Sequence, residues 1–127
     1  MKNEDLVYIC SPLSAPKRSD MKHNMIQAGL YARMVSAYWE CRAIAPHSFL
    51  PEYLDDHIEE EREVALTFGL SVLKLCKALV ICGDRISCGM KGEIQKAKEW
   101  GIPVYRMIET GVSGITLIEE KENPDEM

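Results

Sequence analysis

Residues 78–105 read ALVICGDRISCGMKGEIQKAKEWGIPVY, which is the pattern of a buried strand, a glycine-rich loop, a helix and a second strand. The first five residues are all apolar, as is typical of a strand covered on both faces. Ser87 is placed to cap the helix, and Gly101 stands where a helix C-cap belongs. Strand, helix and strand in this order predict two parallel strands joined by a right-handed crossover.

The same alternation of strand and helix patterns extends outward along the chain. Apolar residues recur at helical spacing after Asp20, a candidate helix cap, and again in the following segment, giving expected helices at residues 21–41 and 59–77. Further strands are expected at residues 6–10, 42–46 and 115–118. We therefore predict an α/β fold built on a parallel sheet of four to five strands.

Length and composition predict a single domain. The chain has 127 residues and a mass of 14.4 kDa. A chain of this size buries about two-thirds of its surface on folding, which is enough for one core. Residues 1–118 hold the strand and helix patterns and form the expected domain. Residues 119–127 are rich in acids, and we expect an acidic, disordered tail there.

Charge, hydropathy and cysteine use exclude several classes of protein. The net charge is −5 without a basic stripe, so binding to long nucleic acid is not expected. No apolar run reaches the roughly 18 residues of a membrane span, and the first residues lack the apolar segment of a secretion signal. Five cysteines without a CxxC pair indicate reduced thiols and a cytoplasmic location.

Three loops are expected to meet at the carboxyl edge of the sheet, where ligands bind in open parallel sheets. They comprise residues 11–20, 47–58 and 83–92. The third is the most informative, because Ser87 and a turn at Gly89 would present free N–H groups of a helix N-terminus to an anion. The same pattern also fits a capped helix that binds no ligand and carries Glu93 as a surface residue.

The other two loops add polar residues to this edge. Lys17, Arg18 and Lys22 could hold a phosphate or form a solvated surface. The second loop offers His47, Asp55, Asp56 and His57, although a lone histidine after a strand is more often structural than catalytic.

Cysteine and glycine patterns predict no cofactor. Cys88 at a helix N-terminus could be an activated nucleophile, but the spacing supplies no histidine partner. The histidines of the middle loop and the nearby cysteines have no recognised metal-ligand spacing. The glycines of the third loop match neither the GxGxxG fingerprint nor a P-loop.

Three segments carry a family pattern: YICSP at 8–12, IAPHSFLPEYLDD at 44–56 and SCGMKGEIQKAKEWGIPV at 87–104. Together they resemble the nucleoside 2-deoxyribosyltransferase-like superfamily, and within it a subgroup of small phage and mobile-element proteins. The resemblance covers about residues 6–105. It implies a flavodoxin/Rossmann-like three-layer sandwich, a homodimer or higher homo-oligomer, and cleavage or exchange of the N-glycosidic bond of nucleosides or nucleotides without a metal or redox cofactor.

The resemblance also assigns roles to single residues. In the characterised enzymes a glutamate at the position of Glu93 attacks the anomeric carbon of the sugar. Members that hydrolyse nucleoside 5′-monophosphates have a serine at the position of Ser87, whereas nucleoside transferases have an aspartate there. We therefore expect Ser87, with the amides of Gly89 and Met90, to bind a 5′-phosphate. Other expected binding residues at this edge are Ser11, Pro12, Arg18 and Gly83.

The chain departs from the family pattern on the second helix. Members carry aspartates where this chain has Gly69 and Lys77, and the first of them handles the base. Assistance to the leaving base would then come from His47 or Asp56. Two hypotheses stay open: an enzyme acting on the N-glycosidic bond, and a non-catalytic module that senses or sequesters a nucleotide. A purely structural interaction domain is a third.

Large apolar residues in the first two helices predict a homo-oligomer. One small α/β sheet is not expected to bury all of them. The residues concerned are Met34, Tyr38, Trp39 and Phe68.

Overall fold

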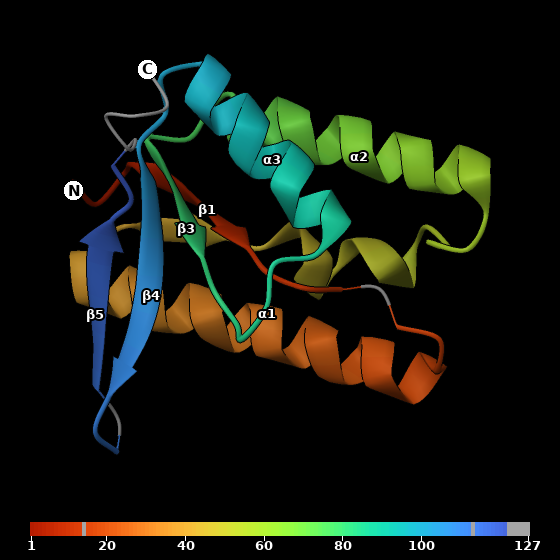
Figure 1. Ribbon diagram of the computed structural model, residues 1–127, viewed down its shortest axis with the longest axis horizontal. Helices are drawn as coiled ribbons and strands as arrows, with labels where there is room; N and C mark the ends of the chain where they lie inside the picture. Colours follow the sequence, from red (N-terminus) through yellow and green to blue (C-terminus); the bar gives the residue numbers. More distant parts are fainter. Residues whose placement is uncertain (14, 113, 122–127) are drawn as a thin grey trace.

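The computed structural model describes residues 1–13, 15–112 and 114–121. A five-stranded sheet forms its centre, with strand order β2-β1-β3-β4-β5 (Figure 1). The strands are β1 (Leu6–Cys10), β2 (Arg42–Ile44), β3 (Ala78–Ile81), β4 (Val104–Thr110) and β5 (Gly114–Glu119). β1 pairs in parallel with β2 and β3, and β3 pairs in parallel with β4. The predicted α/β class with a largely parallel sheet is confirmed.

The last strand corrects the prediction of a wholly parallel sheet. β5 pairs antiparallel with β4, placing Ile118 opposite Arg106. A parallel neighbour needs a crossover of about a dozen residues, but only residues 111–113 separate these two strands. The chain instead turns back at Gly111, whose φ of 70° suits glycine, and forms a hairpin.

The helices of the described chain begin and end near their predicted bounds. They are α1 (Arg18–Trp39), α2 (Glu59–Leu73) and α3 (Cys88–Glu99), and the short 3₁₀ helices η1 (Pro46–Ser48) and η2 (Leu50–Glu52) lie in the segment predicted as a loop. Asp20 lies in the first turn of α1, whose N-cap is Lys17. α2 ends at Leu73, earlier than predicted, and the Lys77 amide donates to the Leu6 carbonyl at 2.8 Å at the edge of the sheet.

The sheet lies between α1 on one face and α2 and α3 on the other (Figure 1). Successive residues of β1 alternate between these faces, as a strand requires. Val7 and Ile9 pack in the core under α1, whereas Tyr8 and Cys10 pack in the core under α2 and α3. A polar side chain on the second face therefore points toward α3.

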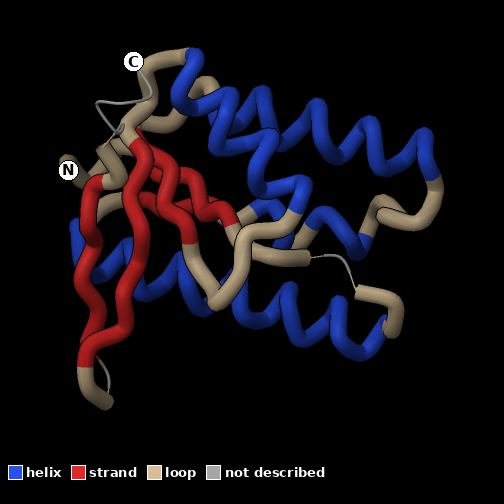
Figure 2. The backbone as a smooth tube through the Cα atoms, viewed as in Figure 1, coloured by secondary structure: helices blue, strands red, loops and turns tan. Residues whose placement is uncertain are grey.

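The carboxyl edge of the sheet has a switch point between β1 and β3. The connection from β1 to β2 runs through α1 on one face, and the connection from β2 to β3 runs through α2 on the other. Figure 2 shows the loops that follow β1 and β3 leaving the sheet at the same edge. Ligands of doubly wound sheets bind in the crevice at such a point.

The end of the chain is described as far as Lys121. Glu119 ends β5, and the Glu120 carboxylate accepts a hydrogen bond from Nε of Arg106 at 2.6 Å. Residues 122–127 of the expected acidic tail lie outside the described residues. Within the described chain, no helix combines the length and apolarity needed to cross a bilayer.

Candidate functional site

Glu93 is buried beneath the carboxyl edge of the sheet. It lies on the inward face of α3 with Met90 and Ala97, which are three and four residues away and share its side of the helix. Its exposed fraction is 7%, the lowest of any acidic residue that the structure describes. The alternative interpretation of Glu93 as a surface residue is therefore wrong. Buried carboxylates are rare unless they have partners.

Two side chains of β1 donate to the Glu93 carboxylate. The hydroxyl of Tyr8 donates to Oε2, and the thiol of Cys10 lies 3.6 Å from Oε1. Tyr8 and Cys10 are two residues apart on one strand, so both point to the α3 face. The strand thus presents one donor to each oxygen of the same carboxylate.

The surroundings of Glu93 have opposite effects on the pKa of its carboxyl group. Burial raises the pKa of its carboxyl, while His47 and the hydrogen bonds from Tyr8 and Cys10 act to lower it. Burial and the neighbouring Glu93 charge also raise the pKa of Tyr8 and the pKa of Cys10. Tyr8 and Cys10 therefore stay protonated at neutral pH and remain donors to the carboxylate.

A small cavity of about 40 Å³ brings Glu93 together with the other two predicted catalytic residues. His47 and Asp56 line it from η1 and from the segment before α2. The Nδ1 atom of His47 lies 2.9 Å from the Ser11 carbonyl oxygen. A carbonyl only accepts, so Nδ1 carries the proton and Nε2 is the ring nitrogen left for another partner.

Gly69 on α2, where we expect the sequence to depart from the pattern it resembles, also lines this cavity. A Cβ atom there would lie 2.9 Å from the Tyr8 hydroxyl oxygen and 3.6 Å from Oε2 of Glu93. The first distance is too short for a real Cβ contact. The Tyr8–Glu93 pair thus occupies the space that a side chain at position 69 would need.

Ser87 caps α3 as predicted. Its Oγ accepts a hydrogen bond from the Met90 amide at 3.3 Å, which leaves the hydroxyl proton free to be donated elsewhere. The Met90 amide is thus already engaged, while the adjacent Gly89 is exposed. Ser87 and Gly89 do not line the small cavity around Glu93.

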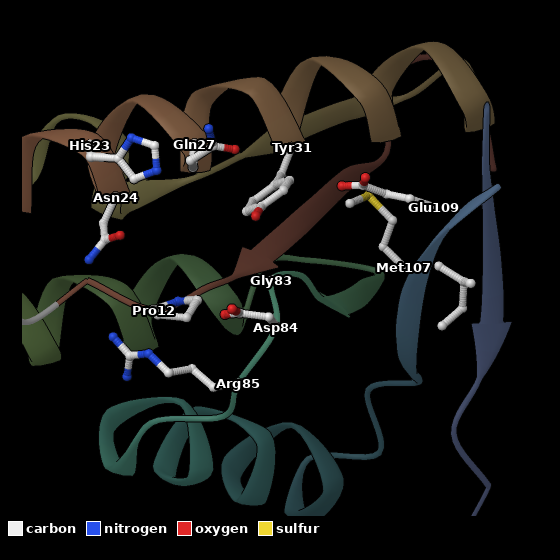
Figure 3. A pocket seen from close by; sticks show the side chains of 11 residues that line it. Pro12, His23, Asn24, Gln27, Tyr31, Gly83, Asp84, Arg85, Met107 and Glu109 are labelled. Atoms are coloured by element: carbon white, nitrogen blue, oxygen red, sulfur yellow. The ribbon is translucent and has the colours of Figure 1, made fainter. Parts of the chain in front are cut away.

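The predicted binding residues of the first loop fall into different surroundings. Arg18 lines a cavity of about 420 Å³ that shares Pro51, Leu54 and Asp56 with the Glu93 cavity and so adjoins it. Ser11 is buried, and its Oγ has no hydrogen-bond partner among the described residues. Pro12 and Gly83 line a separate cavity on the α1 side, seen in Figure 3.

Sequence reasoning missed the two donors to Glu93. Tyr8 and Cys10 read only as members of an apolar strand. The available signal was the Tyr8 hydroxyl, because a tyrosine in a strand covered on both faces must find a buried hydrogen-bond partner. All five cysteines are free thiols, and Cys88 alone among them is exposed. Among the described residues no group of three His, Cys, Asp or Glu side chains is arranged to hold a metal ion.

Comparison with known proteins supports the fold and shows the family. A search among curated proteins finds no match. A solved 2-deoxyribosyltransferase from the psychrotolerant bacterium Bacillus psychrosaccharolyticus is similar in fold, with a TM-score of 0.60 and 17% sequence identity. The similarity covers 84% of this chain and 74% of that enzyme. Residues 5–107 match the domain of unknown function DUF7768, and the chain therefore belongs to the DUF7768 family.

Proposed function

We propose that this protein is an enzyme that cleaves or transfers the N-glycosidic bond of a nucleoside or nucleotide, with Glu93 as the nucleophile. The observation that carries the proposal is the buried Glu93 carboxylate with one donor on each oxygen, facing a small cavity that adjoins a larger one of about 420 Å³. Burying a carboxylate is costly for folding, so its retention in a cavity favours a functional role. The shared fold with a 2-deoxyribosyltransferase agrees with this chemistry.

The proposed step forms a bond between a Glu93 oxygen and the anomeric carbon of the sugar. The bond from that carbon to the base nitrogen breaks, and its electron pair leaves with the base. Positive charge develops on the sugar in the transition state, and a carboxylate beneath it stabilises that charge. Water then releases the sugar from Glu93, or a second base nitrogen takes it in a transfer reaction.

The departing base needs a proton, and His47 or Asp56 supplies it in this proposal. Both line the Glu93 cavity. The Nδ1–H of His47 is held by the Ser11 carbonyl, so a protonated ring would direct its Nε2–H elsewhere. This arrangement would do the work of the aspartate that the family pattern has at Gly69.

A 5′-phosphate on the substrate is proposed to bind at the N-terminus of α3. The Ser87 hydroxyl proton and the amide of exposed Gly89 are suited to an anion, and the helix dipole favours negative charge there. The Met90 amide could join them by exchanging its bond to Ser87. Arg18 lines the cavity that adjoins the Glu93 cavity and is the candidate positive charge on that side of the site.

A non-catalytic nucleotide-binding module is the second candidate. The observation in its favour is Gly69, where the Tyr8 hydroxyl leaves no room for the aspartate of the deoxyribosyltransferase-like pattern. Such a module would bind the ligand without releasing a base.

A panel of nucleosides and their 5′-monophosphates separates the two functions. Each compound is incubated with the protein, and free base is measured by chromatography alongside a thermal melt of the same mixture. The enzyme hypothesis predicts base release from at least one compound. The binding hypothesis predicts stabilisation, about 2.7 kcal/mol at 100 times the dissociation constant, without base release.

A further inference from the structure

A second and larger cavity, of about 690 Å³, opens on the α1 side of the sheet. It lies at the switch point, between the loop after β1 and the loop after β3, and extends to the end of β4 (Figure 3). It shares no lining residue with the Glu93 cavity, which belongs to the α2 and α3 side. Nothing in the proposed glycosidic chemistry uses it.

The centre of this cavity contains an aromatic ring. Tyr31 extends from α1 toward the loop after β3, where Gly83 and Asp84 lie (Figure 3). Gly83 has a φ of 100°, and a Cβ there would lie 3.0 Å from Cδ of Pro12 and 3.8 Å from the Tyr31 hydroxyl oxygen. Because position 83 is a glycine, the loop after β3 can lie close to Pro12 and Tyr31. The Tyr31 ring therefore faces the polar residues of this loop across the cavity.

Two acidic and two basic side chains line this cavity. Asp84 and Glu109 lie on either side of Tyr31 (Figure 3). Burial is the main cause of the raised pKa of the Tyr31 hydroxyl, and Cys82 and these two carboxylates add to it. His23 on α1 and Arg85 on the loop after β3 both lie on the Pro12 side of Tyr31, across the cavity from each other (Figure 3). Within the described part of the chain, none of these four polar side chains has a hydrogen-bond or ion-pair partner.

A ligand that complements this cavity carries hydrogen-bond donors for Asp84 and Glu109 and an anionic group for Arg85. Asp84 and Glu109 are exposed, and a carboxylate only accepts hydrogen bonds, so they favour a ligand that presents N–H groups. Of the common nucleobases, guanine presents two adjacent N–H donors, its ring imide and its 2-amino group. Adenine and cytosine place an acceptor nitrogen beside their amino group, which a carboxylate would repel. A guanidinium such as that of Arg85 suits a phosphate.

We propose that this cavity is a second ligand site, specific for a guanine nucleotide. The guanine ring packs against Tyr31, its N–H edge donates to Asp84 and Glu109, and the phosphate pairs with Arg85. The amide of Gln27, which also lines the cavity, can donate to the guanine carbonyl. This second site does not involve Glu93, so the proposal can be correct or wrong independently of the proposed function.

Calorimetric titration of the full chain with three probes tests the site. Guanosine 5′-monophosphate carries both recognition groups, inosine 5′-monophosphate lacks the 2-amino group, and guanosine lacks the phosphate. The titrations use the Ser87→Asp, Glu93→Gln double variant, so that no probe is consumed and a phosphate is repelled from the N-terminus of α3. We expect the complete nucleotide to bind at least tenfold more tightly than either of the others.

Substitutions assign the binding to this cavity. Asp84→Asn should abolish the preference over inosine 5′-monophosphate, and Arg85→Gln should abolish the preference over guanosine. The control Glu63→Gln changes an exposed acid on α2, across the sheet, and should preserve both preferences. Equal binding of the three probes, no binding, or preferences that persist in Asp84→Asn and Arg85→Gln would overturn the assignment. This test measures binding and not base release. Its result can therefore be interpreted even if the protein proves not to be an enzyme.

Discussion

The hydroxyl of Tyr8 on β1 donates a hydrogen bond to Oε2 of Glu93 on α3, joining two residues that lie 85 positions apart in the sequence. The bond ties the central strand to the helix that carries the candidate nucleophile. The Tyr8 hydroxyl also fills the space that a Cβ atom at Gly69 would need. The expected outcomes of several substitutions follow from this pair and from its surroundings.

Gly69→Ala should destabilise the wild-type protein but not the Tyr8→Phe variant. Alanine normally stabilises a helix interior relative to glycine by about 0.5–1 kcal/mol. Here its Cβ would collide with the Tyr8 hydroxyl, and overpacking of this kind costs about 1–3 kcal/mol. Denaturant unfolding of the two single variants and the double variant measures the coupling between the positions.

Gly92→Ala on α3 is the matched control for this series. A Cβ at Gly92 would meet nothing within 4 Å, so alanine should stabilise the protein there. If Gly69→Ala stabilises the wild-type protein as Gly92→Ala does, the close approach of Tyr8 to position 69 is wrong.

The stability of Glu93→Gln relative to wild type should increase with pH. Burial raises the pKa of the folded Glu93 carboxyl above its ordinary value of 4.5. Between 4.5 and the raised value, the folded state holds a proton that the unfolded state has lost, so the wild-type free energy of unfolding falls as pH rises. Glutamine does not titrate and removes this loss.

Melting temperatures of both proteins from pH 4 to pH 8 provide the measurement. The difference, variant minus wild type, should be smallest at the acid end and grow toward neutral pH. A difference that shrinks as pH rises would mean that hydrogen bonds and His47 outweigh burial, and that the pKa of Glu93 is lowered.

Ser87→Asp should weaken binding of a nucleoside 5′-monophosphate by at least tenfold, or about 1.4 kcal/mol. The new carboxylate would repel a phosphate at the N-terminus of α3. The parent nucleoside has no phosphate and serves as the control ligand, whose affinity should not fall in the same way. Unchanged affinity for the monophosphate would place the phosphate away from Ser87.

The protein should form a homo-oligomer through α1. Ile26, Leu30, Met34 and Tyr38 repeat every four residues and leave 38–64% of their surface exposed. Sedimentation at tens of micromolar should give a multiple of 14.4 kDa, and Leu30→Glu should reduce it to the monomer. Val64→Glu on α2 is the control. A 14.4 kDa species alone in the wild-type protein would contradict the prediction.

Two of the four residues that first suggested an oligomer have partners within the chain. Trp39 packs edge-on against Tyr105 with ring centroids 4.7 Å apart, and Phe68 packs edge-on against Phe49 at 6.1 Å. Trp39 is half-buried by its contact, whereas Phe68 stays exposed. Sequence periodicity cannot distinguish these cases, because aromatic contacts depend on which elements meet in space.

Local sequence patterns were sufficient for the strands and for the start of α3. The apolar runs at β1 and β3 are short and uninterrupted. Ser87 is the N-cap of α3, as predicted from its position at the end of the glycine-rich loop. The direction of β5 depends on the short connection after Thr110, which the apolar pattern of the strand does not contain. The hydrogen-bond partners of Glu93 could not be predicted from local sequence patterns, because they lie on a strand far away in the sequence.

Base release by Glu93→Gln, compared with wild type, tests the nucleophile most directly. Glutamine keeps the shape of the side chain and can still accept from Tyr8, but it cannot form the bond to the anomeric carbon. With a substrate identified from the panel, we predict a fall in turnover of at least about 10³-fold, or about 4 kcal/mol of barrier. Glu99→Gln, an exposed site on the same helix, should retain full activity. Base release at the wild-type rate in Glu93→Gln would contradict the assignment of Glu93 as the nucleophile.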